Sequence, residues 1–160
     1  MTPQAPRVLL AASGSAASRH ATAVAADLAS TFEAQLAILH VVPPVEYRVG
    51  RLAPTLPITQ RLNDPLTSPV LSDARRVAWA RGANTKTILV AGDPATVVVA
   101  IAGELGADLL VIGSTRRLLT GALAAKTRLW VIARAPCPVL PVTAQRRPST
   151  RPTRQPVLVT

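Results

Sequence analysis

Residues 109–117 carry the residue types and spacing that could bind a phosphate group. An apolar run at 109–112 leads directly into Gly113 and a polar turn that contains Ser114 and Arg116. In open parallel sheets, a buried strand that ends at a glycine before a helix presents backbone N–H groups to a ligand phosphate. We therefore predict an anion-binding turn in which residues 113–117 lie beside the ligand.

No pattern typical of a catalytic or metal centre accompanies this turn. Lys126-Thr127 resembles part of a P-loop, but the glycines that should precede the lysine are missing, which favours an ordinary helix surface. The two histidines, His20 and His40, have no cysteine, histidine or acid at metal-ligand spacing, so we predict no metal site and a buried, hydrogen-bonded role for His40. Ser13 has no evident general base nearby, and we predict turn and cap roles for it and its neighbouring serines.

Composition predicts one globular, cytoplasmic unit. The chain has 160 residues, 49% of them hydrophobic, which is enough for a stable core without disulfides. The single cysteine, Cys137, excludes an internal disulfide and suits a reducing compartment, and we expect a packed thiol. We expect no signal peptide and no membrane span, because no apolar run reaches the roughly 18 residues that a span needs.

The net charge of +10 alone would suggest an anionic partner such as nucleic acid. The chain has only four aromatic residues, however, so the stacking platforms of single-strand binders are mostly missing. Nucleic-acid contact through an arginine-rich tail therefore remains an alternative rather than the main expectation.

Strand and helix patterns alternate along the chain. Apolar runs predict strands at 7–12, 34–42, 86–91 and 108–112, and helices are predicted after Ser15, at 68–82, and from Asp93-Pro94 to Gly106. The first helix should bury a stripe of mostly small residues: Ala17, Ala21, Val24, Ala25, Leu28 and Phe32. This alternation predicts an α/β fold with a doubly wound parallel sheet and helices on both faces.

The remaining segments define the domain organisation. Residues 1–144 are predicted to form the α/β domain, with a proline-rich surface loop at 45–69. Residues 145–160 form a basic, proline-rich tail that we expect to be disordered. Residues 156–160 nearly repeat residues 138–143, so the end of the tail could act as an added edge strand.

Ligands in such folds bind at the carboxyl ends of the strands. This rule places Ser13, Val42, Gly92 and residues 113–117 along one rim of the predicted sheet.

Several ordered segments resemble the universal stress protein family. Residues 8–15 with Ser18 resemble the family's first strand and turn, residues 39–43 its second strand, and residues 92–94 the start of its third helix. The most specific segments are 107–114 and 135–140, and the resemblance spans 7–143. It implies an open five-stranded parallel sheet of order 3-2-1-4-5 and a homodimer paired through the last strand.

ATP-binding members of this family carry a glycine, two residues, a second glycine, nine residues, and then a glycine with serine or threonine. The chain keeps Gly113 at the first position, but Arg116 stands at the second. Counting back from Cys137, the chain has lost one residue in this region. The last pair is therefore filled by Ala125-Lys126 or, if the lost residue is placed later in the segment, by Lys126-Thr127.

These departures predict an altered site. Ser13 replaces the family's acidic residue, which removes a partner for magnesium or a ribose hydroxyl, and Arg116 places a long side chain in the phosphate cradle. Basic residues in the same region, Arg117 and Arg128 among them, still suit a phosphate. The candidate binding residues are Ser13, Val42, Gly113, Ser114, Arg116, Lys126 and Thr127.

The resemblance predicts a non-catalytic, homodimeric stress or signalling module that does not bind ATP in the usual way and takes another anionic ligand instead. One alternative is an ATP-binding member with slow hydrolysis, and another is a basic protein that contacts nucleic acid through its tail. The dimer is expected through residues 139–142 or through 156–160, since Pro141 removes one ladder donor from the last strand.

Overall fold

The computed structural model describes residues 4–42, 60–61, 68–114 and 122–144. The helices alternate with the five longer strands, as predicted. The helices and strands are β1 (Arg7–Ala12), α1 (Ala16–Thr31), β2 (Gln35–Val42), β3 (Gln60–Arg61), α2 (Pro69–Ala80), β4 (Asn84–Ala91), α3 (Pro94–Leu105), β5 (Leu109–Ser114), α4 (Ala122–Arg134) and β6 (Val139–Thr143).

The strands form one sheet in the order β3-β4-β2-β1-β5-β6. The five longer strands are parallel, and numbered among themselves they have the predicted order 3-2-1-4-5. The fold is therefore the predicted doubly wound α/β sheet. The antiparallel strand β3 at the β4 edge was not predicted, because it lies within the proline-rich segment 45–69. Most of that segment and the tail at 145–160, with its proposed edge strand, lie outside the described residues.

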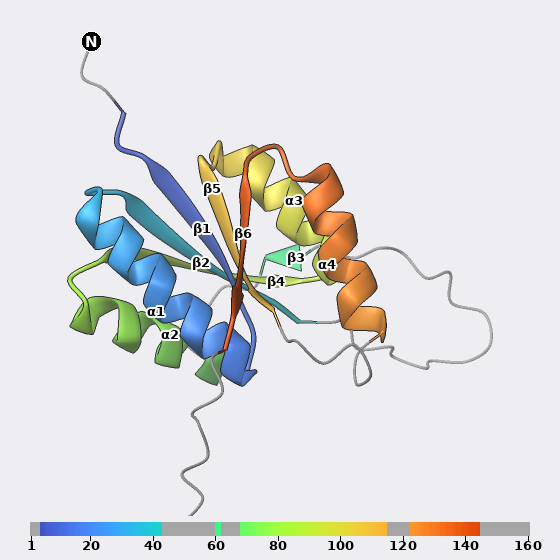
Figure 1. Cartoon of the computed structure of the whole chain (residues 1–160), viewed down its shortest axis with the longest axis horizontal. Helices are drawn as coiled ribbons and strands as arrows, with labels where there is room; N and C mark the ends of the chain where they lie inside the picture. The colour runs from blue at the N-terminus through green and yellow to red at the C-terminus, as the bar shows by residue number, and fades with distance from the viewer. Residues whose placement is uncertain (1–3, 43–59, 62–67, 115–121, 145–160) are drawn as a thin grey trace, which may run out of the picture.

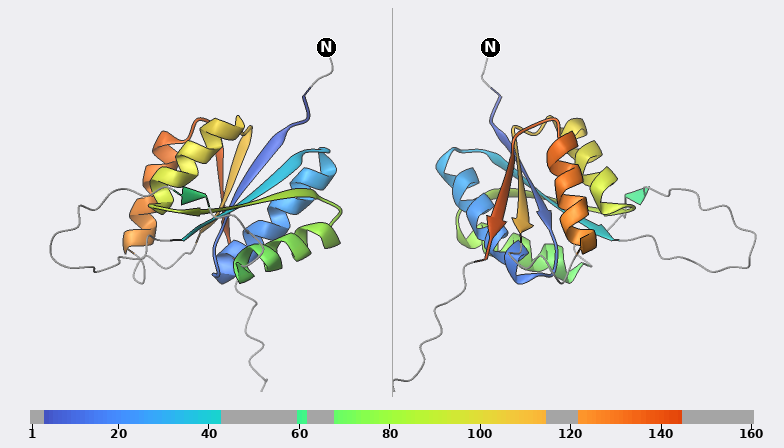
Figure 2. Two further views of the ribbon diagram at one scale, coloured as in Figure 1. Left: turned by 180° about the vertical axis from the view of Figure 1, so that it is seen from behind. Right: turned by 45° about the vertical axis from the view of Figure 1, so that its right-hand side comes forward.

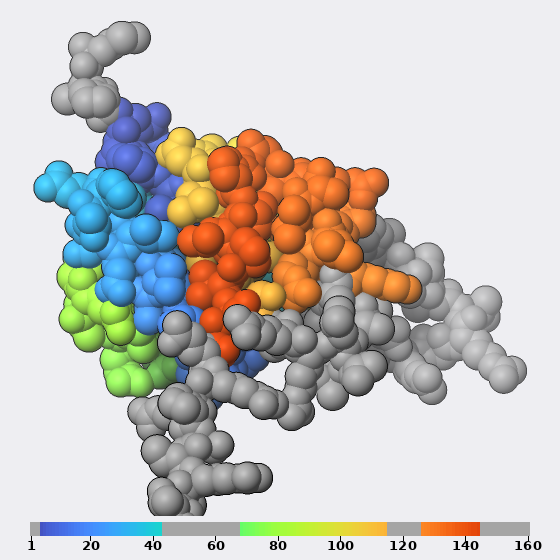
Figure 3. Space-filling view, viewed as in Figure 1, coloured from blue at the N-terminus to red at the C-terminus, as the bar shows by residue number. Residues whose placement is uncertain are grey.

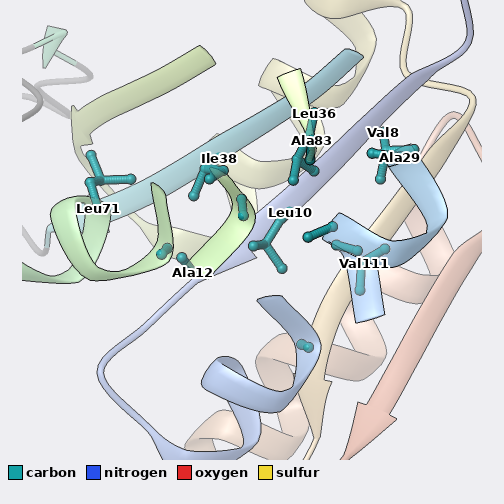
Figure 4. Close-up of a cluster of buried hydrophobic side chains, with 14 of the residues drawn as sticks. Val8, Leu10, Ala12, Ala29, Leu36, Ile38, Leu71, Ala83 and Val111 are labelled. Atoms are coloured by element: carbon teal, nitrogen blue, oxygen red, sulfur yellow. The ribbon is translucent and has the colours of Figure 1, made fainter. Parts of the chain in front are cut away.

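Two helices cover each face of the sheet, with α1 and α2 on one side and α3 and α4 on the other (Figures 1 and 2). Between the sheet and α1/α2 lies a core that includes Leu10, Leu36, Ile38 and Leu71 (Figure 4). A second core, which includes Leu9, Leu39, Val98 and Ile101, lies on the α3/α4 side. Because the central strands are buried on both faces, their sequences are near-continuous apolar runs.

Helix α1 lies close to the sheet because its buried face consists of small residues. Ala17, Ala21 and Ala25 of the predicted stripe are buried, and Ser15 caps the helix by accepting a hydrogen bond from Ser18 N. The prediction that Phe32 continues this stripe is wrong, since its side chain is 64% exposed. The helix ends one residue earlier, at Thr31, and Phe32 is the C-cap, where the chain leaves the helical path.

The predicted boundaries of α3 are confirmed by its caps. The Asp93 carboxylate accepts a hydrogen bond from Thr96 N at 2.9 Å, and Pro94 occupies the first turn. Gly106 ends the helix with φ of 57°, a left-handed conformation that glycine adopts without a Cβ clash.

Strand β6 is the last strand of the sheet on its side, and it reaches the surface between α1 and α4 (Figure 3). Leu110 N donates to Pro138 O at 3.0 Å, and Leu110 is in register with Val139. Since backbone groups alternate in direction along a strand, those of residues 138, 140 and 142 face β5, and those of 139, 141 and 143 face outward. Pro141 therefore leaves the β5 ladder intact and removes one N–H from the outer edge.

Of the helices in the described part of the chain, none combines the length and the apolar character that crossing a membrane requires.

Candidate functional site

A cavity of about 520 Å³ opens at the carboxyl ends of the central strands, on the α3/α4 side of the sheet. In this strand order β1 and β5 are neighbours, and the chain leaves them toward opposite faces of the sheet. In this class of fold, ligands bind in the crevice between two such strands. The cavity is lined by Ala11, Ala12 and Ser13 of β1 and its turn, Leu39, His40 and Val41 of β2, Pro94 and Val98 of α3, Ile112 and Gly113 of β5, and Thr127, Arg128 and Val131 of α4.

Most of this wall is apolar. Leu39 and Val41 of β2 face Val98 of α3 and Val131 of α4. Leu39, Val98 and Val131 belong to the α3/α4-side core, and Val41 packs against it. An apolar cavity with a few polar groups at one end suits a ligand with a flat, weakly polar ring and a polar remainder.

His40 lies at the end of β2 between Leu39 and Val41, in register with Ala12 and Leu89 of the α1/α2-side core, so its side chain lies on that side of the sheet. Its side chain is half-buried, and its Nδ1 lies 2.9 Å from the backbone oxygen of Ala12 on the neighbouring strand. The predicted hydrogen bond of His40 is therefore present, and it holds the ring against β1.

The turn after β1 is closed by its own serines. Ser13 N donates to Ser18 Oγ at 2.7 Å, Ser18 N donates to Ser15 Oγ at 3.1 Å, and the Ser13 and Ser15 hydroxyls are 3.0 Å apart. These contacts are the predicted turn and cap roles. They also occupy two amides that an open turn would offer to a phosphate.

Gly113 is constrained by helix packing. A Cβ on this residue would lie 2.7 Å from Ser18 N and 2.9 Å from the carbonyl carbon of Ala17, both backbone atoms in the first turns of α1. The end of β5 thus needs a glycine to let α1 approach, whether or not a ligand binds.

Arg128 gives the cavity its positive charge. It is half-buried, lies on α4, and lines the cavity beside Thr127. Among the described lining residues none carries a carboxylate. The nearby Asp93 caps α3, accepting from the Thr96 amide and hydroxyl at 2.9 and 2.8 Å.

Three of the predicted binding residues line the cavity: Ser13, Gly113 and Thr127. Val42 packs against the core on the α1/α2 side, and Ser114 and Lys126 are not among the lining residues. Arg116 lies outside the described residues.

Sequence reasoning missed Val41 and His40 as members of this wall, whereas it placed Arg128 in the region of the phosphate site. Residues of β2 alternate between the two cores, with Leu39 and Val41 on the cavity side. That alternation is hidden in the sequence, because both faces of the strand are apolar. Of the α4 residues, Val131 could be placed only once the helix was known to pass over the strand ends.

Cys137 packs against the α3/α4 core before β6 begins. Burial, with a smaller contribution from the negative charge of Asp108, raises the pKa of the Cys137 thiol. This environment disfavours the reactive thiolate, in keeping with the predicted packed thiol.

In the part of the chain that the structure describes, no three His, Cys, Asp or Glu side chains are grouped closely enough to hold a metal ion.

Comparison with known proteins agrees with this geometry. The chain is 28% identical over 146 residues to the universal stress protein YxiE of Bacillus subtilis, covering 84% of this chain and 96% of that protein. A solved universal stress protein in complex with cAMP is 26% identical, with a TM-score of 0.64 and coverage of 86% and 95%. The universal stress protein UspA from Lactobacillus plantarum is 25% identical, with a TM-score of 0.61 and coverage of 88% and 99%.

The family model of the universal stress proteins matches residues 5–143, which include every helix and strand that the structure describes. The chain therefore belongs to the universal stress protein family.

Proposed function

We propose that this chain is a non-catalytic stress or signalling module whose cavity binds a nucleotide with a single phosphate group, and that it does not bind magnesium-ATP in the usual way. The observation that carries the proposal is the charge balance of the cavity. Its described lining residues include one arginine, Arg128, and none of them is a carboxylate.

The apolar wall formed by Leu39, Val41 and Val98 suits the faces of a nucleobase. Arg128 on α4 provides a cation for one anionic group, and Thr127 lies beside it in the cavity wall. A triphosphate carries more negative charge than one arginine balances, and it normally enters with Mg²⁺ held partly by carboxylates. The neighbour that is 26% identical was solved in complex with cAMP, a nucleotide of the proposed class.

The side chains near the cavity favour binding over catalysis. The Ser13 hydroxyl is within 3.0 Å of Ser15 Oγ, and the hydrogen bond of His40 goes to a backbone carbonyl. A nucleophile activated by a base would need those two side chains to be bonded to each other.

The test is calorimetric titration of the full chain with cAMP and with ATP, each with EDTA and with excess Mg²⁺. We expect cAMP to bind with the same affinity in both conditions, and ATP to bind more weakly and without gain from Mg²⁺. Replacing the Arg128 guanidinium, in Arg128→Gln, should weaken cAMP binding about tenfold, the loss expected for one charge-assisted hydrogen bond.

Arg76→Gln is the matched control, since it removes the same charge from an exposed residue of α2 on the opposite face of the sheet. It should leave cAMP affinity unchanged. Tight ATP binding that depends on Mg²⁺, accompanied by release of phosphate, would instead support an ATP-binding member with slow hydrolysis.

The proposal includes assembly into a homodimer through the outer edge of β6. This edge is not paired with another described strand, and it lies exposed beside α4 (Figure 3). A second β6 related by a two-fold axis could extend the sheet there.

A further inference from the structure

We infer that the outer edge of β4, together with Trp79 of α2, binds an extended acidic peptide of a partner protein as an added strand. This surface consists of Arg75, Trp79, Thr85, Lys86 and Thr87. The last three belong to the amino-terminal half of β4, whereas the cavity described above opens at the carboxyl ends of the strands. The inference therefore does not depend on the proposed function.

Backbone groups on this half of β4 point away from the sheet. Just after β4 ends, Gly92 N donates to Val42 O of β2 at 3.0 Å. Because backbone groups alternate in direction along a strand, those of residues 84, 86 and 88 also face β2, and those of Thr85 and Thr87 face outward. The outward N–H and C=O groups of these two threonines are the ones that an added strand would pair with.

No described strand pairs with this part of the edge. Strand β3 pairs with residues 90 and 91, at the carboxyl end of β4. Thr85 and Thr87 are half-buried, and Lys86 between them is exposed. An accessible strand edge of this kind is a template for pairing with another chain.

Trp79 lies beside this edge and is held in place although it is exposed. Its side chain is 58% exposed, its Nε1 donates to Thr85 Oγ1 at 2.7 Å, and the guanidinium carbon of Arg75 lies 4.4 Å from its ring centroid. A side chain that is already ordered loses little conformational entropy when a partner covers it, and tryptophan is enriched among the residues that dominate binding energy. Trp79 is therefore the expected apolar anchor of this surface.

The charge of the surface favours an acidic partner. Arg75 forms no ion pair with a described carboxylate, unlike Arg76 and Arg81, which each pair with an aspartate. Lys86 adds an exposed cation on the edge itself. Among the described residues, the carboxylate that lines the same hollow as Lys86 is Glu104, so the cations outnumber it. The net charge of +10 attracts acidic segments as well.

The alternation of side chains along an added strand predicts the pattern of the peptide. Lys86 is in register with Ala37 of β2, which packs against the α3/α4-side core, so Lys86 lies on that face of the sheet. Trp79 and Arg75 lie on the other face, next to Thr85. Successive side chains of a strand point to opposite faces. The peptide should therefore alternate apolar side chains over Trp79 with acidic side chains beside Lys86.

The experiment measures fluorescence anisotropy while the full chain is titrated into a labelled peptide of alternating valine and glutamate. We expect saturable binding that weakens as the salt concentration rises. A peptide of alternating valine and lysine should bind at least about tenfold more weakly, because its charge opposes Arg75 and Lys86. The valine–glutamate peptide with N-methylated backbone amides should also lose at least about tenfold, because it keeps its charge but cannot donate hydrogen bonds to the edge.

Variants locate the peptide on this surface. Trp79→Ala should weaken binding about tenfold or more. Thr87→Pro removes one outward N–H at an edge position where proline is tolerated, and should weaken binding about fivefold. Thr87→Ala keeps that N–H and should bind like the wild type. Lys86→Gln should weaken binding about threefold, whereas Lys126→Gln, at an exposed lysine of α4, should leave it unchanged.

The outcomes decide between the possible occupants of the edge. If the wild type does not bind the valine–glutamate peptide, the inference is overturned. Equal affinity for the N-methylated peptide, or binding that survives both Trp79→Ala and Thr87→Pro, overturns it as well. Self-association that Thr87→Pro abolishes, without peptide binding, would assign the edge to a second copy of the chain instead. The comparison of peptides uses wild-type protein, so it holds even if a variant fails to fold.

Discussion

At the scale of single residues, Gly113 has backbone neighbours on a different element at less than 3 Å from where a side chain would begin. Neither Ser18 N nor the Ala17 carbonyl carbon can rotate away, as the end of a flexible side chain could. Gly113→Ala should therefore destabilise the protein by about 1–3 kcal/mol, the usual effect of overpacking, which urea unfolding would measure.

Gly103→Ala is the matched control. Gly103 is exposed on α3, and its nearest neighbour to an added Cβ is Pro136 Cγ at 3.9 Å. Because alanine is the better helix former, this variant should be more stable by about 1 kcal/mol. Equal effects of the two variants would show that the approach of α1 is not what constrains Gly113.

Cys137 gives a prediction that depends on pH. Burial and then the Asp108 charge raise its pKa, so at a given pH the folded chain holds less thiolate than the unfolded chain. Alkylation by iodoacetamide at pH 8–9 should be slower in native protein than in urea. The raised pKa also makes the free energy of unfolding depend on pH. The stabilisation from this thiol is complete below its pKa in the unfolded chain and is lost as the pH rises through its pKa in the folded chain.

Asp108→Asn checks the smaller of the two causes. It removes the charge but keeps an oxygen that can accept from Arg7 N, which Asp108 binds at 2.8 Å. Alkylation should become modestly faster, because burial remains the larger cause. A rate unchanged by the substitution would assign the whole shift to burial.

At the scale of elements, α3 places Pro94 and Val98 in the cavity wall, and its first turn depends on the Asp93 cap. Asp93→Ala removes an acceptor for Thr96 N and should destabilise the protein by about 1 kcal/mol. Asp93→Asn keeps a side-chain oxygen that can cap the helix and should lose only a few tenths of a kcal/mol of stability. Thermal unfolding of the three proteins makes the comparison.

The elements that could be predicted from sequence are those with local signals. The Asp93-Pro94 start and the Gly106 end of α3 are set by backbone chemistry within a few residues, and both were predicted correctly. The prediction for Phe32 was wrong, because the helical spacing of apolar residues in the sequence continues past Thr31, where the helix ends. Strand β3 has two residues, too few for any periodic pattern.

The candidate site was less predictable, since it depends on which elements meet. Sequence order placed Ser13 and Gly113 at strand ends, and both line the cavity. Choosing Val41 over Val42 required knowing which face of β2 looks toward α3. His40 was predicted to be hydrogen-bonded, but the group that it contacts, the backbone oxygen of Ala12, follows from the register of β2 with β1.

At the scale of the whole molecule, the outer edge of β6 sets the strength of the proposed dimer. In any two-fold antiparallel pairing through residues 139, 141 and 143, each Pro141 fails to donate one hydrogen bond. Pro141→Val supplies two N–H groups per dimer. At roughly 1 kcal/mol each, they should tighten the dimer about thirtyfold, as measured by sedimentation equilibrium.

Pro141→Ala restores the same N–H with a smaller side chain, so it separates the hydrogen bond from side-chain packing. Thr143→Pro removes a second outward donor and should weaken the dimer further. A dimer whose dissociation constant is unchanged in all three variants would place the interface elsewhere on the molecule.

The packing of α1 against Gly113 also bears on how sequences of this family are interpreted. A glycine at the end of β5 will be retained by natural selection wherever α1 lies this close, including in lineages that have lost their ligand. Its presence in a sequence is therefore evidence of the fold, whereas, if the proposed function holds, a change at the position of Arg128 would accompany a change of ligand.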